Sequence, residues 1–244
     1  MPTQITNTSI TTDSVTAPTI TGSTSVTTPT VNANTIDPTQ GYLNIAQQNA
    51  TGEGGEIHLA GSNGNANAVI DNNNGAIRIL QGANTRIRVD PNGHVTYPTS
   101  VFFWAWRASN ADYGSTHNNT KLTGWDVIHN GINRGSGYDT STSRFTAPVT
   151  GIYHFELKAY TGPNTNGFIG IEFRKNATAN VAGAHDFRKY CHNVNGYESV
   201  GFNGYVDMSA NDYVEIFFVQ HSGSALMHTS SGTFYSGFIG RLVA

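Results

Sequence analysis

Alternating apolar and polar positions predict β-strands across the C-terminal half of the chain. Around Tyr153, Phe155 and Leu157 every second residue is apolar, and the residues between them are polar. A period of two places the apolar side chains on one face of a strand and the polar ones on the other. Aromatic and β-branched runs follow at 167–174, 199–207, 212–220 and 234–243. Because no long window shows the 3.6-residue apolar spacing of a helix, the sequence predicts an all-β fold.

The segment 41–98 predicts a smaller β-rich module, which we call the collar. Short apolar runs lie at 56–59, 67–71, 76–80, 85–89 and 94–97. Asn-Gly pairs between them supply the positive φ angles that tight hairpin turns require. Five such short strands enclose little core of their own. We therefore expect the collar to need partners.

Residues 1–40 carry a repeat with a five-residue step, rich in Thr, Ser and Asn. Its β-branched members are Ile5, Ile10, Val15, Ile20, Val26, Val31 and Ile36. One interpretation is a disordered tail, because so few apolar side chains do not offset the entropy of ordering the chain. The other is a fibrous shaft in which three chains wind together and place these residues on a common axis. The regular spacing favours the shaft, with the first residues as the attachment end.

A longer pattern organises the C-terminal half. Asn133, Tyr138, Phe145, Gly151, Tyr153 and Phe155 stand at fixed steps, and the chain closes with Phe234-Tyr-Ser-Gly237-Phe238. This constellation resembles the globular domain of the complement component 1q family, a branch of the tumour-necrosis-factor-like jelly rolls. The resemblance covers 101–244 and implies a jelly-roll knob over 99–244 that associates as a homotrimer. Val127 and Leu157 depart from the family's preference for aromatic residues.

The collar contains the motifs Gly-Gly-Glu-Ile-His-Leu and Asp-Pro-Asn-Gly-His-Val. With these motifs its sequence resembles the β-rich repeats of phage tail-fibre proteins, notably those of cyanophages. The resemblance implies a fibre protein of a virion, attached to other virion proteins through its N-terminus. The sequence begins without the basic and apolar regions of a signal peptide. Assembly in the host cytoplasm and release on the particle surface agree with that, and we expect a virion protein.

Composition and motifs argue against several classes of protein. Charged residues make up 12% of the chain and the net charge is −3, so no basic stripe marks a nucleic-acid binder. There is one cysteine, and no apolar run is long enough to span a membrane. Motifs of hydrolases, phosphate-binding loops and zinc proteases are absent, and the histidines are scattered singly. We therefore expect no enzyme activity, no cofactor and no metal site.

Aromatic side chains give the one hint of a ligand. Tyr160, Tyr190 and Tyr197 lie in or beside polar, Gly-rich segments. Sugars stack on such rings while Asn and Asp bind their hydroxyl groups. We predict that these tyrosines contact a host-surface receptor, either a glycan or an envelope protein. Two alternatives stay open: a head fibre or decoration protein whose knob mainly trimerises, and a bacterial surface or spore-coat protein.

Overall fold

The computed structural model describes most of the chain from the collar onward. The described residues are 53–61, 64–113, 119–161, 167–178, 186–191, 198–220, 227–229 and 236–244. The predicted shaft, 1–40, with its axis residues from Ile5 to Ile36, lies outside them. The described secondary structure is entirely β, as the alternation predicts. The boundaries of the three predicted segments stay predictions.

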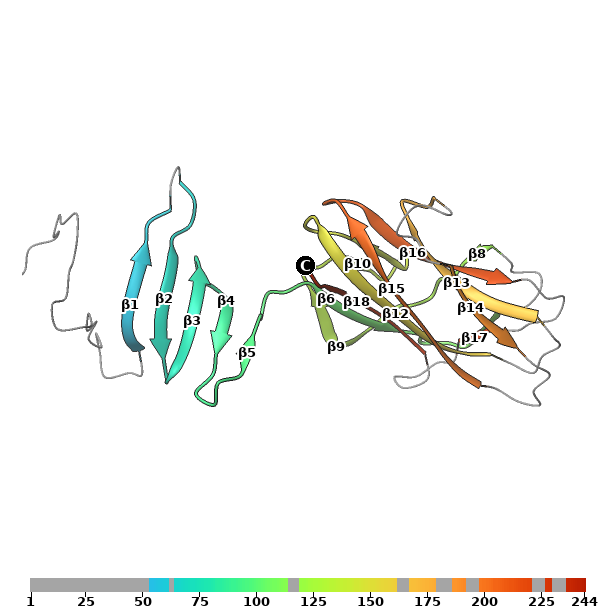
Figure 1. Cartoon of the computed structure of the whole chain (residues 1–244), viewed down its shortest axis with the longest axis horizontal. Helices are drawn as coiled ribbons and strands as arrows, with labels where there is room; N and C mark the ends of the chain where they lie inside the picture. The colour runs from blue at the N-terminus through green and yellow to red at the C-terminus, as the bar shows by residue number, and fades with distance from the viewer. Residues whose placement is uncertain are drawn as a thin grey trace, which may run out of the picture. The chain divides into compact units, whose positions relative to one another are not determined.

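Five antiparallel strands of the collar form one sheet in chain order (Figure 1), which we call the collar sheet. They are β1 (Glu53–Leu59), β2 (Ala68–Asn73), β3 (Ala76–Gln81), β4 (Asn84–Val89) and β5 (Val95–Thr96). All five overlap the runs predicted from the sequence. Asn74 and Gly75 join β2 to β3 with φ angles of 48° and 77°, as an Asn-Gly hairpin requires. At the next Asn-Gly pair, the Asp90 carboxylate accepts the backbone N–H groups of Asn92 and His94.

The remaining strands form two antiparallel sheets. Their bounds are β6 (Phe102–Trp106), β7 (Ala111–Tyr113), β8 (Thr120–Lys121), β9 (Val127–Arg134), β10 (Tyr138–Asp139), β11 (Arg144–Thr146), β12 (Gly151–Thr161), β13 (Gly167–Lys175), β14 (Asp186–Cys191), β15 (Glu198–Met208), β16 (Tyr213–Gln220), β17 (Met227–Thr229) and β18 (Gly237–Leu242). One sheet has six strands in the order β10-β11-β16-β13-β14, with β8 also on β16. The other sheet has seven strands, in the order β7-β17-β12-β18-β6-β9, and β15 pairs with β12 along the whole length of β12. The first strand of the sandwich, β6, thus pairs with the last, β18, and the chain crosses repeatedly between the sheets, for example from β11 to β12 and from β15 to β16. This is the predicted jelly-roll sandwich.

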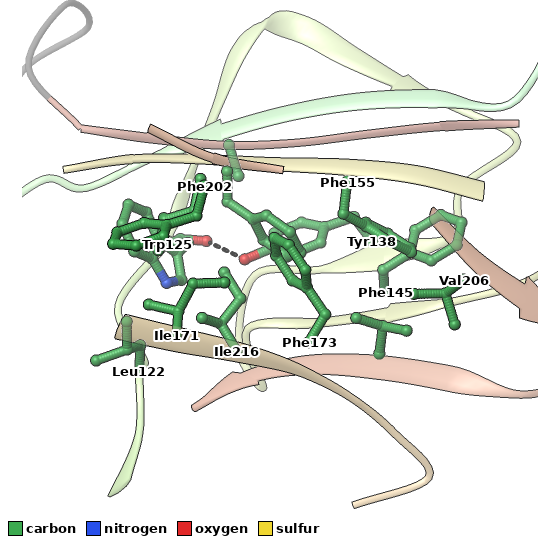
Figure 2. Packing of buried hydrophobic residues seen from close by; sticks show 14 of the residues in the cluster. Leu122, Trp125, Tyr138, Phe145, Phe155, Ile171, Phe173, Phe202, Val206 and Ile216 are labelled. Carbon is green, nitrogen blue, oxygen red and sulfur yellow. Dashed lines mark hydrogen bonds between the residues drawn. The ribbon is translucent and has the colours of Figure 1, made fainter. Parts of the chain in front are cut away.

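An aromatic core fills the space between the two sheets (Figure 2). Tyr153, Phe155 and Leu157 of β12 are fully buried, as their alternation predicts. They face apolar side chains of the six-stranded sheet, including Ile171 and Phe173 of β13. Other rings join them: Phe103 of β6 stacks on Tyr138 at 4.5 Å and on Phe145 at 5.1 Å between ring centroids, and meets Phe238 edge-on at 4.9 Å. Rings at these spacings add attraction beyond the area that they bury.

Asn133 has a specific task at the edge of this core. Its side-chain amide donates to the Tyr138 carbonyl at 2.8 Å, and its side-chain oxygen accepts the Tyr138 N–H at 3.2 Å. The Tyr138 hydroxyl in turn donates to the Trp125 carbonyl at 3.0 Å (Figure 2). Burial raises the pKa of this hydroxyl, which therefore stays a neutral donor. The Asn133 side chain thus satisfies both backbone hydrogen-bonding groups of Tyr138, whose ring is buried.

Several glycines are required by close approach. A Cβ on Gly151 would lie 2.5 Å from the carbonyl oxygen of Ala244, where the C-terminus hydrogen-bonds beside β12. A Cβ on Gly240 of β18 would lie 2.3 Å from the Phe103 ring and 2.8 Å from that of Phe155. Gly237, also on β18, is buried, with space for a Cβ limited by the Trp104 indole at 3.3 Å.

Replacing Gly240 by Ala should destabilise the sandwich, because the added methyl group overlaps two core rings. We expect the free energy of unfolding to fall by roughly 2–3 kcal/mol. Gly201→Ala is the matched control, because a Cβ there has no described atom within 4 Å. It should change the same quantity by about 0.5 kcal/mol or less. Urea unfolding followed by circular dichroism measures both, and equal stabilities would contradict this packing.

Candidate interaction surfaces of the sandwich

The outer face of the seven-stranded sheet is rich in aromatic side chains. These side chains follow from alternation, because each is next to a core residue on its own strand and points to the opposite face of the sheet. Strand register places them in rows, with Trp104 beside Ile239 and Phe102 beside Arg241. Tyr205 and Ile152 are 54% and 42% exposed, and Trp104 and Trp106 are half-buried. We call this surface the aromatic face, made of Phe102, Trp104, Trp106, Ile152, Tyr205 and Ile239.

Polar and charged side chains border these rings. Trp104 contacts His129 at 4.0 Å and Tyr205 contacts His154 at 4.9 Å between ring centroids. The Arg134 guanidinium lies 5.4 Å from the Phe102 ring centroid. The neighbouring positions on the same face of β12 are Glu156 and Lys158, both exposed. Aromatic rings mixed with Arg and balanced charges are typical of protein interfaces.

The outer face of the six-stranded sheet instead carries a network of ion pairs. Glu215 of β16 is 3% exposed and accepts hydrogen bonds from Lys121 at 2.5 Å and from Arg144 at 2.9 and 3.1 Å. Arg144 also stacks over the Tyr213 ring at 3.8 Å. Burial alone would raise the pKa of Glu215, but the hydrogen bonds and charges of Lys121 and Arg144 outweigh it and lower the pKa. The carboxylate therefore stays ionised and joins β8, β11 and β16.

A second buried pair lies on the same sheet face. Glu172 accepts a hydrogen bond from Arg174 at 2.7 Å, and the Arg174 guanidinium lies 4.0 Å from the centroid of the Phe217 ring. Asp139 is instead held in a turn by Ser141 and Thr142, whose hydrogen bonds lower its pKa. These contacts give each carboxylate a structural partner.

The two ends of the sandwich differ. At one end, which we call the base, β6 begins and the C-terminal Ala244 bonds to Ile152 at the start of β12. At the other end, the tip, β12 ends where β15 begins, and β13 begins where β14 ends. Figure 1 shows the C-terminus at the base and, away from it, the start of β13 and the end of β14.

The predicted receptor-contacting tyrosines are associated with the tip. Tyr160 lies next to the last residue of β12, and Tyr190 next to the last residue of β14. The backbone of both is described, but their side chains, and Tyr197 altogether, lie outside the described residues. Tyr138 and Trp125 are buried inside the single chain, where they pack the core. The ion-pair network of Glu215 carried no signal in the sequence, since its members are far apart in the chain.

Two searches of the described residues were negative. They contain no group of three or more His, Cys, Asp or Glu side chains that could hold a metal ion. They also contain no helix long and apolar enough to cross a membrane.

Residues 110–239, just over half of the chain, match the model of the C1q domain. The chain belongs to the C1q domain family. Domains of this family are generally non-enzymatic binding or structural domains, and no catalytic family is indicated. No curated protein matches the sequence.

Two solved structures are among those that match the chain. The globular domain of a zebrafish complement 1qA protein is 14% identical with a TM-score of 0.42, and the match covers 59% of this chain and 98% of that one. The Eiger tumour necrosis factor of S. frugiperda is 9% identical with a TM-score of 0.42, and the match covers 60% of this chain and 94% of that one.

Glu215→Gln should destabilise the C1q domain and change its response to acid. At neutral pH the change leaves Lys121 and Arg144 without their anion, and we expect a loss of about 2 kcal/mol in the free energy of unfolding. The folded-state pKa of Glu215 is lowered, so its contribution is complete above the ordinary glutamate pKa of about 4.3 and is lost as the pH falls through the folded-state value.

The difference between wild type and Glu215→Gln should therefore stay constant from pH 8 to about pH 6 and shrink below about pH 4. Urea unfolding at one protein concentration across this range measures it. Val149→Gln, at an exposed position away from the network, is the control and should change the unfolding free energy by less than about 0.5 kcal/mol. A difference that grows toward low pH would contradict the assignment.

Proposed function

We propose that this chain is a structural fibre protein of a phage virion. Its C1q domain forms a homotrimeric knob that binds a host-surface receptor, a glycan or an envelope protein, during adsorption. The observation that carries the proposal is the division of the sandwich into an aromatic side face and two distinct ends. The side face suits association with copies of the chain, and the tip suits contact with a receptor.

Homologues of C1q and tumour-necrosis-factor type are typically homotrimers, which supports self-association through this domain. The aromatic face supplies a suitable surface. Half-buried tryptophans and a largely exposed tyrosine lose water on association, and rings of this kind contribute most of the energy in many interfaces. The charges around them, of both signs, help to fix the register between subunits.

The receptor role rests on polarity along the domain. The preceding chain joins the C1q domain at its base, where β6 begins. A particle attached through the N-terminal segments would hold the base toward itself and present the tip outward. Tyr160 and Tyr190 belong to strand ends at that tip. Three weak sites on one trimer, and many trimers on a particle, would raise avidity through effective concentration.

The virion setting rests on the sequence before the C1q domain. The collar resembles phage tail-fibre repeats, and the five-residue step of residues 1–40 suits a three-chain shaft. We place the protein on the particle surface, bound to other virion proteins through its N-terminus. Antibodies raised against the chain should label purified particles, and unlabelled particles would contradict this placement.

Trp104→Glu should weaken the trimer. A carboxylate placed in the aromatic face would be buried without a partner, at a cost of about 3 kcal/mol, which is roughly a hundredfold in the association constant. Light scattering of the full chain measures the mass, and circular dichroism checks the fold. Tyr205→Glu, at a more exposed position, should act in the same direction. Val149→Glu, at an exposed turn at the base, should leave the mass unchanged.

Tyr160→Ala and Tyr190→Ala should reduce binding of the folded trimer to host cells by about 5- to 30-fold each, since stacking on one ring contributes roughly 1–2 kcal/mol. The same Val149→Glu variant should bind as the wild type does. A glycan array with the wild-type trimer distinguishes a glycan from a protein receptor. A trimer that binds neither the array nor host cells would favour the trimerisation-only alternative.

A further inference from the structure

The collar sheet has one face composed of uncharged and mainly aliphatic residues. Strand register aligns Ile57, Ile70, Ile79 and Ile87 in a row across four strands. Ile77 pairs with Val89, and Val89 with Val95, to extend the same face. We call this surface the apolar collar face: Ile57, Leu59, Ala68, Ile70, Ile77, Ile79, Ile87, Val89 and Val95. Among the described strand positions on this face, none is charged.

The large side chains of this face are exposed in the single chain. Six of them, from Ile79 at 36% to Val95 at 53%, are exposed by a third or more. Together they leave on the order of 500 Å² of apolar surface in water, within the ~300–600 Å² of the largest patches on monomeric proteins. A stable interface removes about 800 Å² per partner. The face is thus large enough to form most of one.

The opposite face of the same sheet is complete without a partner. Asp71 is 4% exposed because Arg78, directly across on β3, covers it and donates from both Nε and a terminal nitrogen to its carboxylate. His58 lies within 2.5 Å of Glu56 on β1. Charged and hydrogen-bonded side chains suit contact with water, so only the apolar collar face calls for a cover.

We propose that the apolar collar face packs against the same face of two further copies of this chain. The inference rests on the homotrimer of the proposed function and assigns the collar a self-association surface of its own. Identical faces without charge approach one another with no like-charge repulsion. Rows of β-branched side chains also suit sheet-on-sheet packing.

Chain connectivity favours copies of the chain as the occupant. β5 ends at Thr96 and β6 of the C1q domain begins at Phe102. Trimeric C1q domains would therefore hold three collars together through a link of a few residues, at an effective concentration in the millimolar range. At that concentration even a modest interface is populated.

The chain's own residues 1–40 are a poorer candidate. Their five-residue step would turn successive Ile and Val side chains to opposite faces of a strand, so that no continuous apolar row would meet the collar. The residues between them are almost all Thr, Ser, Asn and Pro. Copies of the collar, by contrast, offer the same aliphatic rows.

Cysteine placement in the full chain tests the proposal. In a Cys191→Ser background, Ile77→Cys probes the apolar collar face, and His58→Cys is the matched control on the opposite face. The mass of each variant is first measured by light scattering. Both are then treated with a maleimide dye to obtain labelling rates, and with a short bismaleimide to detect cross-links on denaturing gels.

The control position is suitable because the His58 side chain itself is 56% exposed in the single chain. His58 also stands between Ile57 and Leu59 on β1, so that it shares their strand but points to the other face. Both variants therefore carry their thiol on an exposed part of the collar sheet, and only the face differs.

If the proposal holds, both variants have the mass of a trimer. The Ile77→Cys thiol then reacts with the dye at least tenfold more slowly than the His58→Cys thiol, and its bismaleimide product runs at twice the chain mass. A trimer in which both thiols react equally fast overturns the inference and leaves the proposed function standing. Slow labelling without interchain cross-links also overturns it, since the chain's own N-terminal segment would then be the cover. A monomeric mass contradicts the proposed trimer as well.

Discussion

The whole described structure depends on covering the apolar face of a β-sheet, because such a face is unstable in water. In the C1q domain the two sheets cover each other, and rings from β6, β12 and β18 interlock between them. The collar sheet has no second sheet among the described residues. The apolar collar face is therefore exposed to water in the single chain, and we propose that copies of the chain bury it.

The same constraint connects fold and function in the C1q domain. Once alternate residues of β6 and β12 are committed to the core, the residues between them form the outer surface. On this sheet they include Trp104 and Trp106, which are costly to leave in water and suited to a partner. On the outer face of the six-stranded sheet, Glu215 and Glu172 form ion pairs within the chain. The charges of that face are thus paired without a partner, whereas the aromatic face of the seven-stranded sheet suits association.

Local patterns in the sequence predicted a large part of this fold. Alternation located β12, short apolar runs located the collar strands, and the Asn74-Gly75 pair located a hairpin. The jelly roll was implied by the resemblance of the spaced aromatic residues to the complement component 1q family. Long-range contacts were beyond the same reasoning. Glu215 meets Arg144 and Lys121 across 71 and 94 residues of chain, and only strand register brings them together. The bonds of Asn133 to Tyr138 likewise depend on a bend that its spacing does not reveal. The predicted receptor contacts at Tyr160, Tyr190 and Tyr197 stay predictions.

We propose that two further copies of the chain cover both of its apolar surfaces. Sedimentation equilibrium of the unmodified full chain, over a wide range of concentrations, measures the mass of the assembly. We expect a single species of three times the chain mass of 26.2 kDa. A species of one chain mass at all concentrations would contradict it, because the aromatic face and the apolar collar face would then both remain in water.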